Sequence, residues 1–263
     1  MDQPHMSTQP GAPLEPLAPS SLGTRLVNVL AAPGDLFEEV KASPPSTANW
    51  LTPALLLILV AWIGSWLVFS QESIQSQLRE LSTKPIDKQV EAGKMTKEQA
   101  EQARAVAEKF GGMATKIGVF VAPVFVGLAS PFWWALILWL VGTKILKADF
   151  GYMKAVEVAG LANMISILDS MVRTMLILIK GSIFAGANLA LFLPEFDPNK
   201  ALHGTLAALD VFTFWALLIQ SIGLSKLSGV GFGKAAAWII GFWVAWTGFW
   251  LGVGVAIRSA FGG

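Results

Sequence analysis

The sequence predicts an all-α fold: a polytopic membrane protein with five transmembrane helices, N-terminal interfacial amphipathic helices and an extramembrane helical hairpin. Two observations predict it. Of 263 residues, 54% are hydrophobic and only 14% are charged, whereas soluble domains carry about 25% charged residues. Apolar runs long enough to cross about 30 Å of hydrocarbon also recur along the chain. Five such runs cover about 53–69, 117–141, 156–179, 205–224 and 235–257.

The region before the first run divides into a tail and an amphipathic segment. Residues 1–20 hold five prolines among small polar residues, a composition that predicts a disordered tail. In residues 21–42, apolar side chains recur at helical spacing and Pro33 interrupts the run. The segment is too short and too charged to span, so it predicts one or two amphipathic helices at the membrane interface. Soluble helices packed on another loop are the alternative.

The first span and the polar hairpin that follows it have recognisable start and stop signals. Thr52 is expected to cap the first span, with Pro53 as its first residue, where a missing N–H is harmless. Residues 70–116 carry charges of both signs, typical of solvated helix faces. Pro85 is expected to end the first arm, and the capping-box pattern Thr96–Gln99 starts the second.

The second span contains two prolines, Pro123 and Pro131, and each is expected to kink it. Several aromatic side chains follow Pro131, and a kinked aromatic helix lines a pocket in some proteins. Ordinary packing is the interpretation we favour. After the third span, 180–204 includes an apolar stretch too short to cross, which is expected to lie on the surface or to re-enter the bundle.

The third span carries a polar stripe in an apolar segment. An Asp or Arg at mid-membrane costs about 2.5–3.5 kcal/mol on insertion scales, so these side chains must face protein or water. Spacings of three and four residues put most of them on one helical face. The stripe comprises Asn163, Ser166, Asp169, Ser170 and Arg173.

Asp210, near the start of the fourth span, is expected at a depth similar to that of Arg173 if these two spans run antiparallel. The sequence therefore predicts an Asp169–Arg173–Asp210 cluster. Such a cluster is either a proton or ion site or an internal ion pair that sets helix register. We favour the second, because no chain of acids crosses the membrane. Glu157, near the other end of the third span, is expected to snorkel to the surface.

The fifth span has two different faces. Small residues recur along one face at steps of four, three and four, and aromatic residues occupy the other. Small residues let a neighbouring backbone approach closely, so they predict a packing seam, within the chain by preference or between copies in an oligomer. The aromatic side suits lipid. The seam comprises Gly241, Ala245, Gly248 and Gly252.

Several function classes lack support. The chain has no Cys and only two distant His residues, so no metal site is expected. No nucleophile–base pair indicates catalysis, and nothing indicates a cofactor. A net charge of +1 gives no nucleic-acid signal. Seven Lys or Arg residues flank the spans on the N-terminal side against three on the other, which favours a cytoplasmic N-terminus. The basic residues of the hairpin oppose that assignment.

The order of these elements resembles the bacterial branch of the Yip domain family, the Ypt/Rab-interacting proteins. The resemblance lies in Arg25–Val40 followed by Trp50-Leu-Thr-Pro53, in Asp210–Gly223, and in Gly231–Ala235 with the aromatic fifth span. It covers about 22–257. The Asp-Leu-Tyr-Gly-Pro-type motif of eukaryotic members is missing, so binding of a Rab-type GTPase is not carried over.

The resemblance implies a five-helix integral membrane protein without enzymatic activity, placed in the bacterial cytoplasmic membrane. Bacterial relatives look like accessory membrane proteins, some working alongside ABC-type exporters. The first hypothesis is thus an accessory or scaffold protein that contacts lipids and a membrane protein partner, with a homo-oligomer as a further option. The second is a small transporter or channel that uses Asn163, Asp169, Arg173 and Asp210.

Overall fold

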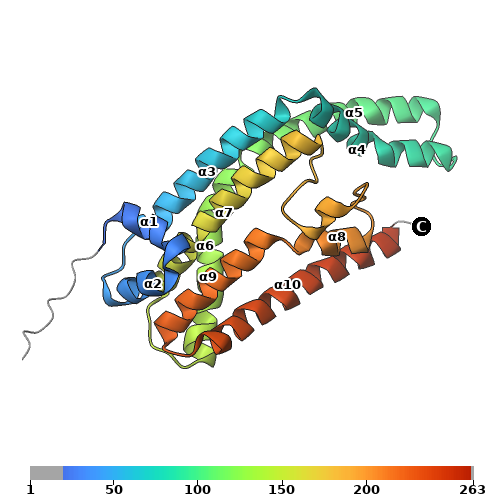
Figure 1. Cartoon of the computed structure of the whole chain (residues 1–263). Coiled ribbons are helices and arrows are strands. Elements are labelled where there is room, and N and C mark those ends of the chain that lie inside the picture. The colour runs from blue at the N-terminus through green and yellow to red at the C-terminus, as the bar shows by residue number, and fades with distance from the viewer. Residues whose placement is uncertain (1–19, 262–263) are drawn as a thin grey trace, which may run out of the picture.

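The structure, a computed structural model, describes residues 20–261, apart from the side chains at positions 112, 114, 116 and 258–261. It confirms the predicted fold class, because helices make up most of the described chain and five of them are long and apolar enough to span a membrane. Figure 1 shows the long helices side by side, with α1 and α2 at one end of the bundle and the α4–α5 hairpin at the other.

The helices follow one another with short connections, apart from the segment between α7 and α9. They are α1 Leu22–Ala31, α2 Pro33–Ala42, α3 Ala48–Phe69, α4 Glu72–Glu91, α5 Lys97–Phe120, α6 Ala122–Leu140 with the π-helical turn η1 Val141–Ile145, α7 Tyr152–Lys180, the 3-10 turn η2 Leu189–Phe192, α8 Ala201–Ala208, α9 Val211–Ser228 and α10 Phe232–Phe261.

The five spanning helices are shifted from the expected ranges at several ends. Thr47 rather than Thr52 precedes the first helix, so Pro53 lies inside α3. The second spanning helix begins at Ala122 rather than 117, because the preceding helix has its C-cap at Val121, two residues before Pro123. Proline has no backbone N–H and cannot donate the next helical hydrogen bond. The spans are Ala48–Phe69, Ala122–Ile145, Tyr152–Lys180, Val211–Ser228 and Phe232–Ile257.

The fourth span differs most from its expected range of 205–224. The short helix α8 ends at Ala208, and α9 begins only at Val211. The Asp210 carboxylate accepts hydrogen bonds from the backbone N–H groups of Phe212, at 2.9 Å, and Thr213, at 3.3 Å. Asp210 is therefore the N-cap of α9. The cap explains why the helix starts here and not six residues earlier.

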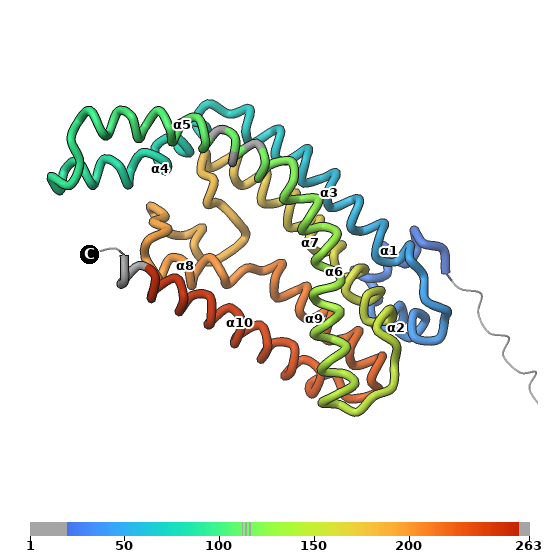
Figure 2. The backbone as a smooth tube through the Cα atoms, turned by 180° about the vertical axis from the view of Figure 1, so that it is seen from behind, coloured from blue at the N-terminus to red at the C-terminus, as the bar shows by residue number. Residues whose placement is uncertain are grey.

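The polar region 70–116 forms a helical hairpin, α4 and α5, that extends beyond the end of α3 (Figure 2). The capping box at Thr96 and Gln99 is present, with Gln99 N–H donating to Thr96 Oγ1 and Thr96 N–H donating to Gln99 Oε1. Pro85 lies within α4 instead of ending it. The α5 helix continues to Phe120, so the hairpin is four residues longer than expected.

The core surrounds the first half of α7. Residues 155–163 are buried on every side of the helix, because α3, α6 and α9 pack around it together with α1 and α2. Glycine allows two of these close approaches. A Cβ built on Gly160 would overlap Trp50 of α3, and one on Gly223 of α9 would overlap Val158. The second half of α7, beyond Ile167, is half-buried or exposed.

The amphipathic helices α1 and α2 pack on the protein. Val29 of α1 and Leu36, Phe37 and Val40 of α2 are almost completely buried within the main hydrophobic cluster. Lys41 also donates to the backbone carbonyl of Lys226 at 2.9 Å. The apolar faces of α1 and α2 are therefore used inside the protein, while their position at the membrane interface stays a prediction. Burial on the bundle removes the same apolar surface from water.

The two faces of α10 follow the prediction only in part. On the aromatic side, Trp238, Phe249 and Trp250 are exposed, as expected of a lipid-facing surface. Trp246 of that side instead lies 5.2 Å from Trp133 of α6, and the neighbouring Trp243 lies 5.2 Å from Phe214 of α9, centroid to centroid. The small-residue seam faces away from the described chain. A Cβ added at its glycines would meet no atom within 4 Å, and Ala245 is exposed. The expected packing of the seam within the chain is therefore wrong; the seam comprises Gly241, Ala245, Gly248 and Gly252.

Two smaller expectations concern the ends of the chain. Residues 1–19, most of the expected disordered tail, lie outside the described residues, as do 262–263. Ser20 is described and is bonded to Glu39 through both its N–H and its hydroxyl. At the other end α10 continues to Phe261, so most of the expected C-terminal tail, 258–263, is helical.

Candidate functional site

The polar side chains of the third span meet Asp210 in a three-residue cluster, hereafter the outer cluster. Arg173 Nη2 lies 3.1 Å from Asp210 Oδ2 and 3.5 Å from Asp169 Oδ1. Asp169 and Arg173 share one face of α7 because they are four residues apart, and the N-cap of α9 supplies Asp210. The structure thus brings together the three residues that the sequence grouped.

The three side chains of the outer cluster differ in their exposure. The side chain of Asp210 is 5% exposed, that of Asp169 is 27% exposed and that of Arg173 is 40% exposed. Two carboxylates and one guanidinium leave a formal charge of −1. A charged group that keeps this much exposure in a membrane needs water or another polypeptide against it. The arrangement can therefore hold a cation or a proton, or pair with a basic group from outside.

The segment between α7 and α8 returns to this cluster. Asn188 forms an isolated antiparallel bridge with Asp210, and Val211 N–H donates to the Ala187 carbonyl at 3.1 Å. A Cβ added at Gly186 would lie 2.7 Å from Arg173 Nη1 and from Asn188 Nδ2, so the backbone passes close to the guanidinium and a larger residue would displace these side-chain ends. The segment therefore packs back into the bundle, which corresponds to re-entry, one of the two alternatives predicted for it.

Asn163 is separate from the outer cluster. Its side-chain amide donates to Ser130 Oγ of α6 at 3.2 Å, and Asn163 is 7% exposed. Ser130 precedes Pro131, so this contact joins two helices at the proline. The functional grouping of Asn163 with Asp169, Arg173 and Asp210 is not seen in the described structure.

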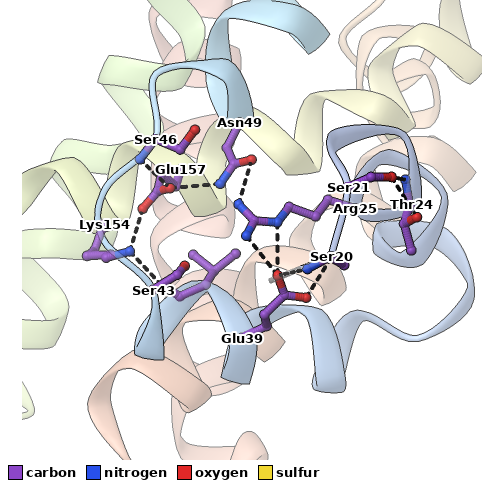
Figure 3. Close-up of polar contacts among 11 residues, drawn as sticks. Ser20, Ser21, Thr24, Arg25, Glu39, Ser43, Ser46, Asn49, Lys154 and Glu157 are labelled. Atoms are coloured by element: carbon purple, nitrogen blue, oxygen red, sulfur yellow. Dashed lines mark hydrogen bonds and ion pairs between the residues drawn. The ribbon is translucent and has the colours of Figure 1, made fainter. Parts of the chain in front are cut away.

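A second polar network, hereafter the inner network, lies at the opposite end of the bundle and was missed by the sequence analysis (Figure 3). Glu157 of α7 is fully buried. Its Oε1 accepts from Asn49 Nδ2 at 2.7 Å and from Ser46 N–H at 2.8 Å, and its Oε2 lies 2.8 Å from Lys154 Nζ. Lys154 also donates to the Val40 carbonyl at the end of α2. Glu157 therefore does not snorkel to the surface.

Asn49 extends the inner network to the amphipathic helices. Its Oδ1 accepts from Arg25 Nη1 at 3.3 Å, and Arg25 Nη2 lies 2.7 Å from Glu39 Oε1. Ser20 completes the network by donating its hydroxyl to Glu39 Oε2 at 2.6 Å. With Lys154 and Glu157, the network contains two cations and two anions, so its buried charges are balanced, as buried charges must be.

Glu39 has a pKa lowered from its ordinary value of 4.5. Burial raises the pKa of this carboxyl, but the hydrogen bonds from Ser20 and the pairing with Arg25 together outweigh burial and lower it. Glu39 is consequently ionised at neutral pH, which is the form that holds Arg25. The ion pair between Glu39 and Arg25 joins α2 to α1, and Arg25 also bonds to Asn49 at the start of α3.

The remaining titratable residues give no sign of a metal centre. Within the described residues, no group of three or more His, Asp and Glu side chains is placed to hold a metal ion. His203 accepts a hydrogen bond at Nδ1 from the backbone N–H of Asp197 at 2.9 Å, while His5 lies outside the described residues. His203 thus fastens the loop before α8.

Comparison with known proteins assigns the family. A model of the Yip1 domain matches residues 27–254, which is most of the chain and includes both polar clusters except Ser20 and Arg25. A protein described as "Membrane protein YknW" from Bacillus subtilis (strain 168) is 26% identical over 218 residues, covering 81% of this chain and 82% of that protein. No solved structure matches. The chain therefore belongs to the Yip1 domain family of membrane proteins.

Proposed function

We propose that this protein is a non-enzymatic accessory or scaffold protein of the bacterial cytoplasmic membrane, acting through contacts with another membrane protein and with lipid. The observation that carries the proposal is the unpartnered face of α10. Only 6% of the most apolar stretch of this helix is buried, and its small-residue seam meets no other part of the described chain.

A seam of this kind favours contact with a second helix. Gly248 and Gly252 are one turn apart and leave a flat surface, so another backbone can approach closely and gain dispersion contacts along its length. Lipid tails cover such a surface less closely than a helix does, because they remain mobile. Contacts of Phe242 and Trp246 with α6 and of Trp243 with α9 anchor α10 to the bundle, so the seam lies on a supported helix.

The partner class that the family resemblance suggests is an ABC-type exporter, and a second copy of this chain is the competing occupant. The polar clusters support a structural rather than an enzymatic role. The charged groups of the inner network are paired with one another, and those of the outer cluster likewise. Ion pairs of this kind are typical of groups that fix helix positions.

The proposed orientation places the N-terminus in the cytoplasm. The structure gathers basic residues from three segments at the α1–α2 end of the bundle: Lys41 contacts the Lys226 carbonyl, Lys226 pairs with Glu38, and Lys154 contacts the Val40 carbonyl. A basic end next to the membrane favours the cytoplasmic side. The hairpin would then project on the opposite side.

The test is crosslinking in native membranes, followed by purification in mild detergent and identification of the crosslinked species. Gly248→Leu should abolish the major crosslinked product, because the added side chain prevents close approach. Gly233→Leu, at the start of the same helix and also in open space, should leave the product unchanged. A monomeric, partner-free species in the unaltered protein would contradict the proposal.

A small transporter or channel remains a second candidate, favoured by the exposure of Arg173 and Asp169 in the outer cluster. In this case the purified protein in proteoliposomes should carry a proton or ion flux. Asp169→Asn should abolish the flux, while Asp149→Asn, in an exposed loop, should preserve it. Absence of flux in the unaltered protein, or equal flux in Asp169→Asn, would exclude this use of the cluster.

A further inference from the structure

A cavity lies where the hairpin leaves the first span. Its volume is about 760 Å³, within the range of about 300–1,000 Å³ typical of small-molecule sites. Three helices line it: the end of α3, one face of α4 and one face of α5. The lining residues used below are Trp66 and Phe69 of α3, Arg79 of α4, and Glu108, Gly111 and Phe120 of α5.

The cavity exists because one face of α5 is built from small side chains. Ala107, Gly111 and Thr115 recur every four residues and all line it, so they share one helical face. A Cβ added at Gly111 would meet no atom within 4 Å. Opposite them, Gln75, Leu78, Arg79 and Ser82 of α4 follow helical spacing and face the same space. The void is thus a consequence of the sequence pattern.

The two ends of the cavity differ in chemistry. At the α3 end it is lined by Trp66, Phe69 and Phe120, and the side chains of Trp66 and Phe120 are 68% and 55% exposed. Trp66 and Phe69 belong to a helix long and apolar enough to span a membrane, so we expect this exposed aromatic surface to contact lipid. The hairpin end carries Arg79 and Glu108. The cavity is therefore mainly aromatic at the α3 end, with Ser65 and Ser70 beside the rings, and charged at the hairpin end.

The two charges at the hairpin end are available to a ligand. Arg104 and Asp87 pair with each other across the hairpin, but within the described residues neither Arg79 nor Glu108 forms an ion pair. A cation and an anion lining one end of a cavity match a headgroup that carries both charges. A singly anionic headgroup would leave Glu108 facing a like charge.

We propose that this cavity binds one phospholipid with a zwitterionic headgroup. Arg79 contacts the phosphate, as guanidinium groups do, and Glu108 contacts the ammonium group. One acyl chain lies along Trp66, Phe69 and Phe120, and the other remains in the bilayer. The bound lipid fixes the hairpin at the membrane surface. The inference does not depend on α10 or on any protein partner.

The experiment is native mass spectrometry of the full chain, released from nanodiscs that contain equal amounts of phosphatidylethanolamine and phosphatidylglycerol. The unaltered protein should retain one lipid, with phosphatidylethanolamine at least fivefold in excess. Gly111→Leu should reduce lipid retention tenfold or more, because its side chain enters the cavity. Gly118→Leu is the matched control: the same change in the same helix, at a residue outside the lining, should retain the lipid.

Charge variants test the headgroup without changing the shape of the cavity. Glu108→Gln removes the contact to the ammonium and the repulsion toward an anionic headgroup, so it should shift the preference toward phosphatidylglycerol. Arg79→Gln should weaken retention of both lipids. Equal retention of the two lipids by the unaltered protein, or an unchanged preference in Glu108→Gln, would overturn the proposal. So would full retention in Gly111→Leu.

Discussion

Asn49 and Glu157 lie 108 residues apart in the chain and meet side chain to side chain, with Asn49 Nδ2 donating to Glu157 Oε1 at 2.7 Å. Both residues are fully buried. Asn49 also accepts from Arg25, so one amide connects a cation of α1 to an anion of α7. The first turn of α3 is therefore one of the places where the N-terminal helices are joined to the membrane bundle.

Asn49→Ala should lower the free energy of unfolding by about 1–3 kcal/mol, because it removes the buried hydrogen bonds that Asn49 makes with Arg25 Nη1 and Glu157 Oε1. The measurement is the thermal midpoint of the purified protein in detergent. Gln102→Ala, an exposed change on the hairpin, serves as the control and should leave the midpoint unchanged. A midpoint for Asn49→Ala equal to that of the control would show that the network adds no stability.

Arg173→Asp should abolish stable expression, because it places three acids together inside the membrane. The paired change Arg173→Asp with Asp210→Arg should restore part of it. Restoration is partial for a structural reason: Asp210 also caps α9, and loss of such a cap costs about 0.5–2 kcal/mol. The measurement is the yield of folded protein in the membrane. If the double variant is no better than the single one, the pairing has no stabilising role.

The stability of the α1–α2 attachment should depend on pH through Glu39. Its folded pKa is below the ordinary value of 4.5, so the folded state favours the charged form. The contribution is fully present above 4.5 and is lost as the pH falls through the lowered folded pKa. Thermal midpoints between pH 7 and pH 3 measure it. Glu39→Gln should lower the midpoint at pH 7 and flatten this part of the profile; an unchanged profile would contradict the assignment.

Gly160→Ala should be strongly destabilising, because its Cβ would overlap Trp50 and overpacking typically costs about 1–3 kcal/mol. Gly241→Ala makes the same change in a spanning helix with open space around it, and it should be tolerated or slightly stabilising, since Ala is the better helix former. Folded yield and thermal midpoint are the measurements. Equal effects of the two changes would argue against the close approach of α3 and α7.

The orientation can be tested directly because the chain has no Cys. A single introduced cysteine is then the only thiol of the protein that a maleimide can label. Ala31→Cys lies at the α1–α2 end and Gln89→Cys lies on the hairpin, and both positions are exposed. With the N-terminus in the cytoplasm, a membrane-impermeant maleimide added to intact cells should label Gln89→Cys and not Ala31→Cys. The opposite labelling would reverse the proposed topology.

The features predicted well from the sequence are those set by helical periodicity along one element. Asp169 and Arg173 share a face because they are four residues apart, and that relation needs no tertiary information. The apolar length of five runs likewise predicts five spanning helices. The start of α9 was missed although Asp210 precedes an apolar run, a position typical of an N-cap, because the apolar residues before it extended the predicted span.

The features missed depend on which face of an element meets which neighbour. Glu157 has three polar neighbours, and only the fold brings two of them, Asn49 and Ser46, to it. The nearby Lys154, at i−3, was the one local signal. The outward position of the α10 seam was missed for a related reason: every face of this helix is apolar, so hydropathy does not say which one turns inward.

The pairing of Arg173 with Asp210 has a consequence for how the protein is made. Synthesis proceeds from the N-terminus, so α7 reaches the translocon while its carboxylate partner, 37 residues downstream, is still being synthesised. Asp169 alone is available to neutralise the guanidinium at that moment. Release of the third span into the lipid must therefore wait for the fourth, and these two helices should leave the insertion machinery as a pair.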